Sequence, residues 1–170
     1  VYVTGTPGDA ALGLRLLQDG RDDALARVMK SRFLAPTARV SIGRALAARH
    51  LATAMIDVSD GLLQDLGHLC AASEVGCAIE APTLPLSLEY RAILGEGEWT
   101  LALTGGEAYE LLFSAPAERY AEVAAIAERE QCRITRIGRI LAHAEGIQVY
   151  GSDGKIAIPT QTGHDHFRSA

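Results

Sequence analysis

The stretch Asp57-Val58-Ser59-Asp60-Gly61-Leu62 constrains this chain most, because it places two carboxylates and a hydroxyl where a short apolar strand gives way to a helix. Gly61 can adopt backbone angles that other residues avoid. Backbone N–H groups at the start of a helix have no intrahelical partner and attract anions. Carboxylates beside them can hold Mg²⁺, which takes oxygen ligands and commonly bridges to phosphates. The stretch therefore predicts either a metal-bound phosphate site or, in the simpler alternative, a helix capped by Ser59 or Asp60.

The composition is typical of one globular domain. With 170 residues, of which 48% are hydrophobic and 22% charged, the chain can bury a genuine core. Its formal net charge of −5 argues against a nucleic-acid surface, so we expect no nucleic-acid partner. No stretch approaches the roughly 20 apolar residues of a membrane span, and no charged-then-apolar leader opens the sequence. We therefore expect no membrane association and a cytoplasmic protein.

The three cysteines, Cys70, Cys77 and Cys132, form no CxxC pair and are odd in number. This usage favours free, buried thiols in a reducing compartment. The chain begins at Val1, inside a predicted strand and without an initiator methionine, and we expect it to be a fragment.

The first third of the chain is predicted to be mostly helical. After a short strand at 1–4, the turn Gly5-Thr6-Pro7-Gly8-Asp9 leads to a helix at 10–17, with Asp9 as its N-cap. Further helices are expected at about 22–32 and from Pro36 to about 49, with Pro36 in the first turn.

The remaining two thirds alternate between strand and helix patterns. Four apolar residues, Leu62, Leu66, Leu69 and Cys70, share one face of the helix after Asp60. The periodicity predicts strands at 53–58, 76–81, 109–114 and 133–141, helices at 87–94 and 117–130, and a hairpin joining 146–150 to 155–158. These elements predict an α+β domain, in which a mixed, largely antiparallel sheet is covered by helices in an α/β/α layered arrangement.

The segment Gly105-Gly106-Glu107 is a second candidate site. Paired glycines allow the backbone to approach a ligand, which Glu107 could then hydrogen-bond or coordinate, although Gly-Gly is also a common turn signal. Glu110 alternates with Leu111 and is expected to be no more than a solvent-facing strand position.

Other patterns carry less weight. The turn at 5–9 looks like a phosphate loop but lacks the Lys-Ser/Thr ending of a Walker A sequence, and the chain contains no GxSxG or HExxH motif. His68 is either a metal ligand or an exposed helix residue. In the tail, His164 and His166 flank Asp165, where a docked tail is favoured over a zinc site.

Several motifs taken together and in order resemble thiamine-monophosphate kinases, a family of the aminoimidazole-ribonucleotide-synthetase-like superfamily. The resemblance extends from Val1 to Phe167, nearly the whole chain. The motifs are Tyr2-Val3-Thr4-Gly5-Thr6-Pro7-Gly8-Asp9, Arg39, Ile56-Asp57-Val58-Ser59-Asp60-Gly61-Leu62, Asp65-Leu66-Gly67-His68, Gly105-Gly106-Glu107, Tyr109-Glu110-Leu111, and Gly163 with Asp165-His166-Phe167.

This resemblance implies a function. Members of the family transfer the terminal phosphoryl group of ATP to thiamine monophosphate, giving thiamine diphosphate by direct in-line transfer with Mg²⁺ and no covalent phosphoenzyme. By likeness of motif, Asp57 and Asp60 would bind Mg²⁺ and Ser59 would contact ATP, which acts as co-substrate. Glu107 and His164 would contact the thiamine substrate, and no residue is assigned as catalytic.

The sequence departs from the family pattern at two positions, and the family has an additional domain. Ala108 stands where the pattern Gly-Gly-Glu-Asp-Tyr has a carboxylate, and His164 replaces the usual Tyr or Trp. The resemblance implies that 1–170 is the C-terminal domain of a two-domain kinase. The N-terminal domain would bring further Mg²⁺ and ATP contacts and the surface of a homodimer, and the fragment alone is expected to be inactive. Two alternatives remain, another ATP-dependent enzyme of the superfamily and a non-catalytic nucleotide-binding or interaction domain.

Overall fold

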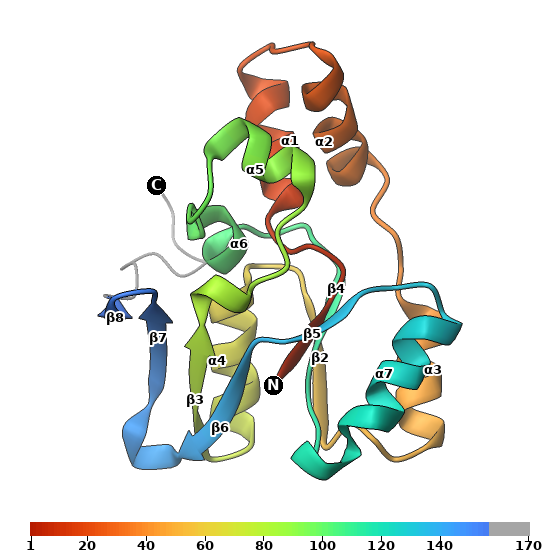
Figure 1. The fold of residues 1–170 in the computed structure, drawn as a ribbon, viewed down its shortest axis with the longest axis vertical. Coiled ribbons are helices and arrows are strands. Elements are labelled where there is room, and N and C mark those ends of the chain that lie inside the picture. The colour runs from red at the N-terminus through yellow and green to blue at the C-terminus, as the bar shows by residue number, and fades with distance from the viewer. Residues whose placement is uncertain (157–170) are drawn as a thin grey trace.

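The computed structural model describes residues 1–156, which form an elongated molecule with helices above and beside two sheets (Figure 1). The described residues contain the α-helices α1 (Asp9–Gln18), α2 (Ala24–Leu34), α3 (Val40–Ala48), α4 (Leu62–Ala72), α5 (Leu88–Leu94), α6 (Thr100–Thr104) and α7 (Tyr120–Arg129). Among them, no helix has the length and apolar character needed to cross a membrane.

The strands are short and divided between two four-stranded sheets. They are β1 (Tyr2–Thr4), β2 (Ala54–Val58), β3 (Val75–Glu80), β4 (Glu110–Ser114), β5 (Ile134–Arg136), β6 (Gly138–Ala142), β7 (Ile147–Gly151) and β8 (Gly154–Ile156). The first sheet has the order β2-β4-β1-β5 and is antiparallel throughout. The second has the order β6-β3-β7-β8, in which β3 and β7 run parallel. The predicted α+β class, with mixed and largely antiparallel pairing, is confirmed.

Each face of the first sheet is covered by helices, so the apolar residues form two cores. On one face Tyr2 stacks on Phe113 with ring centroids 5.3 Å apart, and α3 and α7 pack over this pair. On the other face α4 lies against β2 and also contacts β3 of the second sheet (Figure 1). The predicted stripe on α4 is confirmed, since its four residues are all buried. The three cysteines are also free and buried, as expected.

The single strand predicted at 133–141 is wrong, because the chain changes sheets in the middle of this segment. Residues before Ile137 pair with β1, and residues after it pair with β3. Ile137 is fully buried, and its N–H donates to the carbonyl of Val1 at 2.9 Å. At Gly138 an added Cβ would lie 2.0 Å from the carbonyl oxygen of Ala78, so the close crossing requires glycine. The apolar pattern runs on through the crossing and therefore conceals it.

Two helix predictions also differ from the structure. The third helix begins at Val40 rather than at Pro36, and residues 35–39 form a linker after α2. The helix α6 was not predicted, because its five residues follow a glycine-rich turn and are too short for a clear period. Both differences affect the candidate site, since the linker carries Arg39 and α6 ends directly before Gly105.

Candidate functional site

Three loops leave the same end of the first sheet. Strand β2 ends at Val58, which pairs with Glu110 at the start of β4, and β1 ends at Thr4 on the other side of β4. The loop 59–61 therefore lies beside the loop 105–109, and the loop 5–8 follows β1 at the same end. The strand pairing thus brings together segments that are far apart in the sequence.

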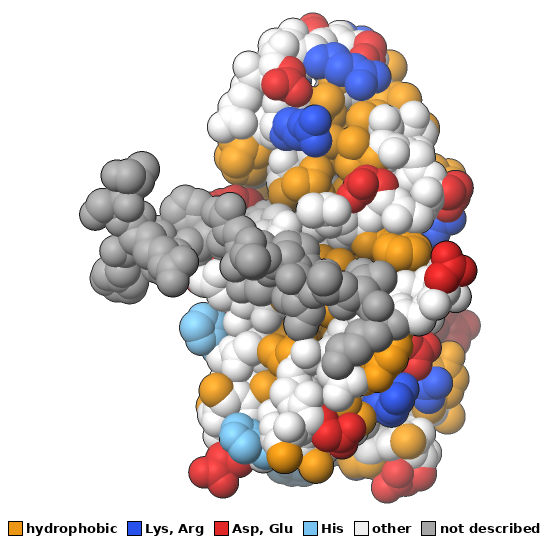
Figure 2. All heavy atoms as spheres, turned by 90° about the vertical axis from the view of Figure 1, so that its left-hand side faces the viewer, with side chains coloured by type: hydrophobic (Ala, Val, Ile, Leu, Met, Phe, Trp, Pro, Cys, Tyr) orange, Lys and Arg blue, Asp and Glu red, His pale blue; other side chains and the backbone are white. Residues whose placement is uncertain are grey.

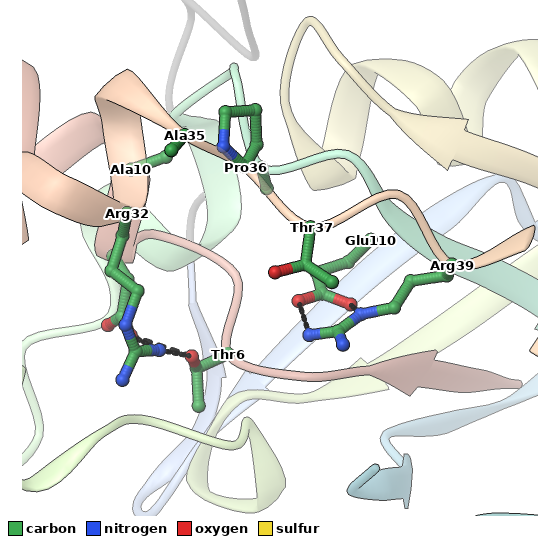
Figure 3. A pocket seen from close by; sticks show the side chains of 10 residues that line it. Thr6, Ala10, Arg32, Ala35, Pro36, Thr37, Arg39 and Glu110 are labelled. Carbon is green, nitrogen blue, oxygen red and sulfur yellow. Dashed lines mark hydrogen bonds and ion pairs between the residues drawn. The ribbon is translucent and has the colours of Figure 1, made fainter. Parts of the chain in front are cut away.

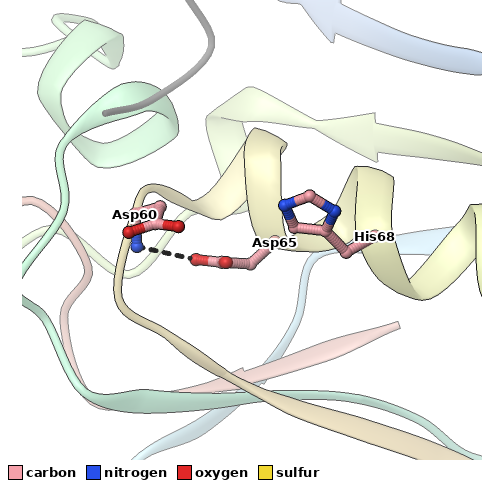
Figure 4. Close-up of side chains that lie close together, drawn as sticks. All are labelled: Asp60, Asp65 and His68. Carbon is pink, nitrogen blue, oxygen red and sulfur yellow. Dashed lines mark hydrogen bonds between the residues drawn. The ribbon is translucent and has the colours of Figure 1, made fainter. Parts of the chain in front are cut away.

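The loop 59–61 is held by a carboxylate from within the following helix. Oδ2 of Asp65 accepts the backbone N–H groups of Ser59 at 3.0 Å, Asp60 at 3.1 Å and Gly61 at 3.2 Å. Figure 4 shows the Asp65 side chain pointing back from α4 toward the backbone of Asp60. The alternative of a cap by Ser59 or Asp60 is wrong, since Gly61 occupies the N-cap position of α4 and no side chain caps it there.

Asp65 also changes how an anion could bind here. Its side chain is only 3% exposed, and burial raises the pKa of its carboxyl group, while the three N–H groups act in the opposite direction. The N–H groups that we expected to face a bound phosphate instead donate to this internal carboxylate. A phosphate at this loop would therefore depend on side chains and metal ions rather than on these N–H groups.

The acidic groups at this end suit a hard cation. Asp60, Asp65 and His68 each offer a ligand atom, and these atoms lie within 4.8 Å of one another. Asp57 is exposed near the end of β2, two residues before the loop. Carboxylate oxygens suit Mg²⁺, which uses few protein ligands and completes its shell with water and phosphate, whereas imidazole suits transition metals better. The residues present therefore fit Mg²⁺ held by carboxylates, with His68 the least suited member.

The loop 105–109 packs directly against the loop 59–61 through the backbone. The N–H of Glu107 donates to the carbonyl of Ser59 at 2.8 Å, and the N–H of Tyr109 donates to the carbonyl of Val58 at 2.8 Å. An added Cβ on Gly106 would lie 2.5 Å from the Ser59 carbonyl oxygen. The glycine pair thus permits close approach, as predicted, but what it approaches is the neighbouring loop of the protein.

Two side chains within the loop 105–109 also interact. The hydroxyl of Tyr109 donates to Oε2 of Glu107 at 3.1 Å. This hydrogen bond is the main reason why the pKa of Tyr109 is raised, and the charges of Asp57 and Asp60 raise it further. Asp57, Ser59, Asp60 and Glu107 are therefore gathered at one end of the sheet. His164, the other predicted substrate contact, lies outside the described residues.

Glu110 was expected to face the solvent, and this prediction is wrong. It is the centre of a buried polar network. Its carboxylate accepts two hydrogen bonds from Arg39, from Nε and Nη2, each at 2.7 Å, and one from the hydroxyl of Thr4 at 2.5 Å. The Thr4 hydroxyl in turn accepts the N–H of Leu111 at 2.8 Å. Glu110 is 7% exposed and Thr4 is fully buried. Alternation along β4 predicted the wrong environment, since a partner 71 residues away in sequence neutralises the charge.

A polar cavity of about 130 Å³ adjoins this network. Figure 3 shows two arginines on opposite sides of it, Arg39 paired with Glu110, and Arg32 from α2 directed toward Thr6. Arg32 also pairs with Asp9 at 3.1 Å. Ala108 contributes to the wall, so the cavity borders the loop 105–109.

Asp9 was expected to be the N-cap of α1, and this prediction is wrong. It is the first residue of the helix. Gly8 holds the N-cap position with φ 95°, a left-handed angle that suits glycine. The Asp9 carboxylate is 2% exposed and accepts hydrogen bonds from the hydroxyls of Thr6 at 2.6 Å and Ser87 at 2.8 Å. Burial raises the pKa of Asp9, and its hydrogen bonds and Arg32 oppose this shift.

Comparison with known proteins agrees with this arrangement. Residues 1–150 match the family described as AIR synthase related protein, C-terminal domain. The chain belongs to this family. This AIR synthase related domain is 38% identical to the thiamine-monophosphate kinase of Salmonella typhimurium over 173 residues, covering 98% of the chain and 52% of the relative. The chain thus spans about half the length of the curated relatives it matches.

Solved structures of similar proteins share the fold of the AIR synthase related domain. A thiamine-monophosphate kinase from Stenotrophomonas maltophilia superposes with a TM-score of 0.82 and 41% identity, over 92% of this chain and 50% of that one. The structure described as AaThiL complexed with AMPPCP and TMP has a TM-score of 0.77 and 35% identity, over 96% of this chain and 50% of that one. The resemblance read from the motifs is confirmed.

Sequence reasoning missed Asp65 and Glu110 as organising residues of the site. Asp65 lies in the first turn of α4, within reach of the N–H groups before it, which is a usable signal for an internal anion. Glu110 is a single charge at the start of the apolar run Leu111-Leu112-Phe113. A charge in such a position needs a partner, but the sequence does not identify Arg39 as that partner.

Proposed function

We propose that this chain is the C-terminal half of a thiamine-monophosphate kinase, which transfers the terminal phosphoryl group of ATP to thiamine monophosphate. The observation that carries the proposal is the convergence of Asp57, Asp60 and Glu107 at one end of the first sheet. Similarity to relatives of that name, and to a structure with AMPPCP and TMP, supports it.

In this proposal the carboxylates of Asp57 and Asp60 hold Mg²⁺. The metal supplies charge neutralisation for the phosphate oxygens and orients them. Asp65 fixes the backbone between the two ligands, since it binds three consecutive N–H groups of the loop. Ser59 lies between the carboxylates, half-buried, and its hydroxyl would donate to a phosphate oxygen of ATP.

Glu107 orients the acceptor, thiamine monophosphate, by an interaction with its cationic or hydrogen-bonding groups. Its carboxylate is exposed, and the Tyr109 hydroxyl holds one of its oxygens. Because the N–H of Glu107 is hydrogen-bonded to the carbonyl of Ser59, the proposed acceptor contact and ATP contact are fixed relative to each other. Such fixed positioning is what in-line phosphoryl transfer requires, and we propose direct transfer without a covalent phosphoenzyme.

The other half of the enzyme would complete the site. We propose that a preceding domain brings additional Mg²⁺ and ATP contacts and forms a homodimer, and that residues 1–170 alone have no appreciable kinase activity. Ligand sites often lie between domains, and the described acidic groups lie at the surface end of the sheet, where a second domain can face them. On the face shown in Figure 2 acidic and basic side chains are interspersed.

The test is an assay of the full-length protein that contains this chain. Purified protein is mixed with ATP, Mg²⁺ and thiamine monophosphate, and thiamine diphosphate is measured by chromatography. We expect turnover, and we expect Asp57→Asn or Asp60→Asn to lower kcat about 100-fold, the equivalent of losing about 2.7 kcal/mol of charge stabilisation. Asp19→Asn, at an exposed carboxylate beyond α1, is the matched control and should retain full activity.

Three outcomes contradict the proposal or part of it. Binding of ATP without formation of thiamine diphosphate would favour a non-catalytic nucleotide-binding module, for which Ala108 and His164 are the sequence arguments. Phosphoryl transfer from ATP to a different acceptor would favour another enzyme of the same superfamily. Equal activity of Asp57→Asn and Asp19→Asn would contradict the assignment of Asp57 as a metal ligand.

A further inference from the structure

We propose that the Arg39–Glu110 pair is a positioning device that sets the affinity for the phosphoryl acceptor by holding the Glu107 loop in place. This inference rests on the proposed function, because it assigns Glu107 to acceptor binding. Arg39 reaches the site from the linker between α2 and α3, and it acts through Glu110 rather than by contact with a ligand.

The pair has the geometry of a clamp. Arg39 uses two different nitrogens, Nε and Nη2, to bind both oxygens of Glu110, each at 2.7 Å. A bidentate pair of this kind fixes the orientation of the carboxylate as well as its distance. The Thr4 hydroxyl also donates to Oε2, so Glu110 connects the linker to the end of β1.

The backbone around Glu110 is built to admit its carboxylate. At Gly5 an added Cβ would lie 1.9 Å from Oε1 of Glu110, so the carboxylate occupies the space that any other side chain at position 5 would take. Gly5 also has φ 56°, in the left-handed region. The carboxylate therefore crosses the start of the loop 5–8 to reach Arg39, and this path exists because residue 5 has no side chain.

The clamp is adjacent to a backbone segment that needs support. Glu107 has φ 65° and Tyr109 has φ 50°, left-handed angles that cost free energy in residues other than glycine and persist only when the surroundings impose them. On one side the N–H groups of these two residues are bonded to the carbonyls of Ser59 and Val58. On the other side the chain continues directly into Glu110. Loosening Glu110 would release one of the two attachments of this strained segment.

A lysine in place of Arg39 would keep the positive charge but lose the two-point hydrogen bonding of the guanidinium group. Its single ammonium group cannot bind both carboxylate oxygens in fixed geometry. The charge of Glu110 would still be balanced, but the orientation of its carboxylate, and with it that of the adjoining loop, would no longer be fixed. This difference separates a positioning role from general stabilisation. A merely structural pair would affect the amount of folded enzyme and leave the affinity of the folded fraction unchanged.

The experiment compares Arg39→Lys and Glu110→Gln with Arg119→Lys in the full-length protein. Arg119 forms a similar two-point pair with Glu122 on α7, at 2.5 and 2.8 Å. It also donates to the carbonyls of Arg49 and His50 before β2, at the opposite end of the first sheet from the Glu107 loop. We expect the first two variants to raise KM for thiamine monophosphate about tenfold or more, the equivalent of losing one charge-assisted hydrogen bond. KM for ATP should change less than about threefold, and Arg119→Lys should leave both constants unchanged.

Other outcomes overturn the inference. If Arg39→Lys lowers kcat or the yield of folded protein with both KM values unchanged, the pair is structural only. If both KM values rise equally, the clamp does not act selectively on the acceptor side. Arg39→Lys retains the charge, but if it fails to fold, Thr4→Val removes the third contact to Glu110 without touching the ion pair, and the same KM criteria apply.

A measurement independent of turnover separates this inference from the proposed function. Hydrogen exchange of the segment 105–112 in the full-length protein reports the hydrogen bonds that Glu107 and Tyr109 donate. We expect exchange about tenfold faster in Arg39→Lys than in wild type or Arg119→Lys. Unchanged exchange would overturn the positioning role. If exchange is faster in Arg39→Lys but the full-length protein makes no thiamine diphosphate, the positioning role of the pair stands and the proposed acceptor is refuted.

Discussion

The carboxylate of Asp65 lies 3.0 Å from the backbone nitrogen of Ser59, six residues earlier in the chain. This contact makes the strand-to-helix junction self-contained, because an acidic side chain of the helix satisfies the N–H groups that precede the helix. It also places a carboxylate within 4.8 Å of the ligand atoms of Asp60 and His68. The junction therefore attracts a cation, whereas a junction with open N–H groups would attract an anion.

Replacing Asp65 with asparagine should destabilise the protein and weaken metal binding together. The amide keeps the shape, but its oxygen is a weaker acceptor for three N–H groups, and we expect a loss of about 1–3 kcal/mol in the free energy of unfolding. Urea denaturation with and without Mg²⁺ measures both effects, with Asp19→Asn as the control. Unchanged stability would mean that the three hydrogen bonds contribute little.

Substituting Gly106 with alanine should disrupt the contact between the two loops. The added methyl group would lie 2.5 Å from the Ser59 carbonyl oxygen, so the backbone must shift. We expect a cost of about 1–3 kcal/mol, typical of overpacking, together with weaker binding of thiamine monophosphate by calorimetry. Gly43→Ala in α3 is the matched control, because its nearest neighbour atom would be 3.5 Å away. That variant should be unchanged or more stable by up to about 1 kcal/mol.

The buried Asp9 predicts a pH dependence opposite to the usual one for a carboxylate. Burial raises its pKa in the folded protein, so the folded state binds the proton more tightly than the unfolded state does. The stability that Asp9 contributes is thus greatest below its ordinary pKa, near 4, and falls as the pH rises through the raised value.

The variant Asp9→Asn tests this sign. The difference in free energy of unfolding between wild type and Asp9→Asn should shift against wild type as the pH increases from 3.5 to 7, measured by urea denaturation at each pH. A difference that grows in favour of wild type over the same range would contradict the direction of the pKa shift.

The buried cysteines should be almost unreactive in the native protein. Burial raises the pKa of Cys77 to about 12, and it raises the pKa of Cys70 and Cys132 as well. Because the thiolate is the reactive form, labelling by an aromatic disulfide reagent at pH 8 should be at least about 100-fold slower in the folded protein than in denaturant. Rapid labelling of Cys77 without denaturant would show that the core around it opens.

Local signals in the sequence predicted much of this architecture. The stretch 57–62 was placed correctly at a strand-to-helix junction, because Ile56, Gly61 and the periodicity of α4 are all local features. The glycine pair 105–106 likewise indicated close backbone approach. The junction at 57–62 depends on interactions within a few residues, which single-sequence patterns record well. The glycine pair indicates close approach, but the sequence does not identify Ser59 as the group approached.

What the sequence could not predict depends on contacts between distant segments. The pairing of Glu110 with Arg39 joins residues 71 positions apart, and alternation along β4 gives no hint of it. The change of sheets at Ile137 has the same origin, since an apolar residue fits either sheet equally well. Asp65 is intermediate, because its partners are close in sequence but its inward orientation is set by the burial of α4.

The carboxylate of Glu110 occupies the space that a side chain at position 5 would need. This has a consequence for how the protein can evolve. Four positions, 4, 5, 39 and 110, share one small space, so a larger residue at position 5 would displace the charge and leave Arg39 unpaired. Divergent descendants of this sequence should therefore exchange these four residues as a group or retain them all. The loop around Ala108 is free of that restriction and is where we expect new acceptor preferences to arise.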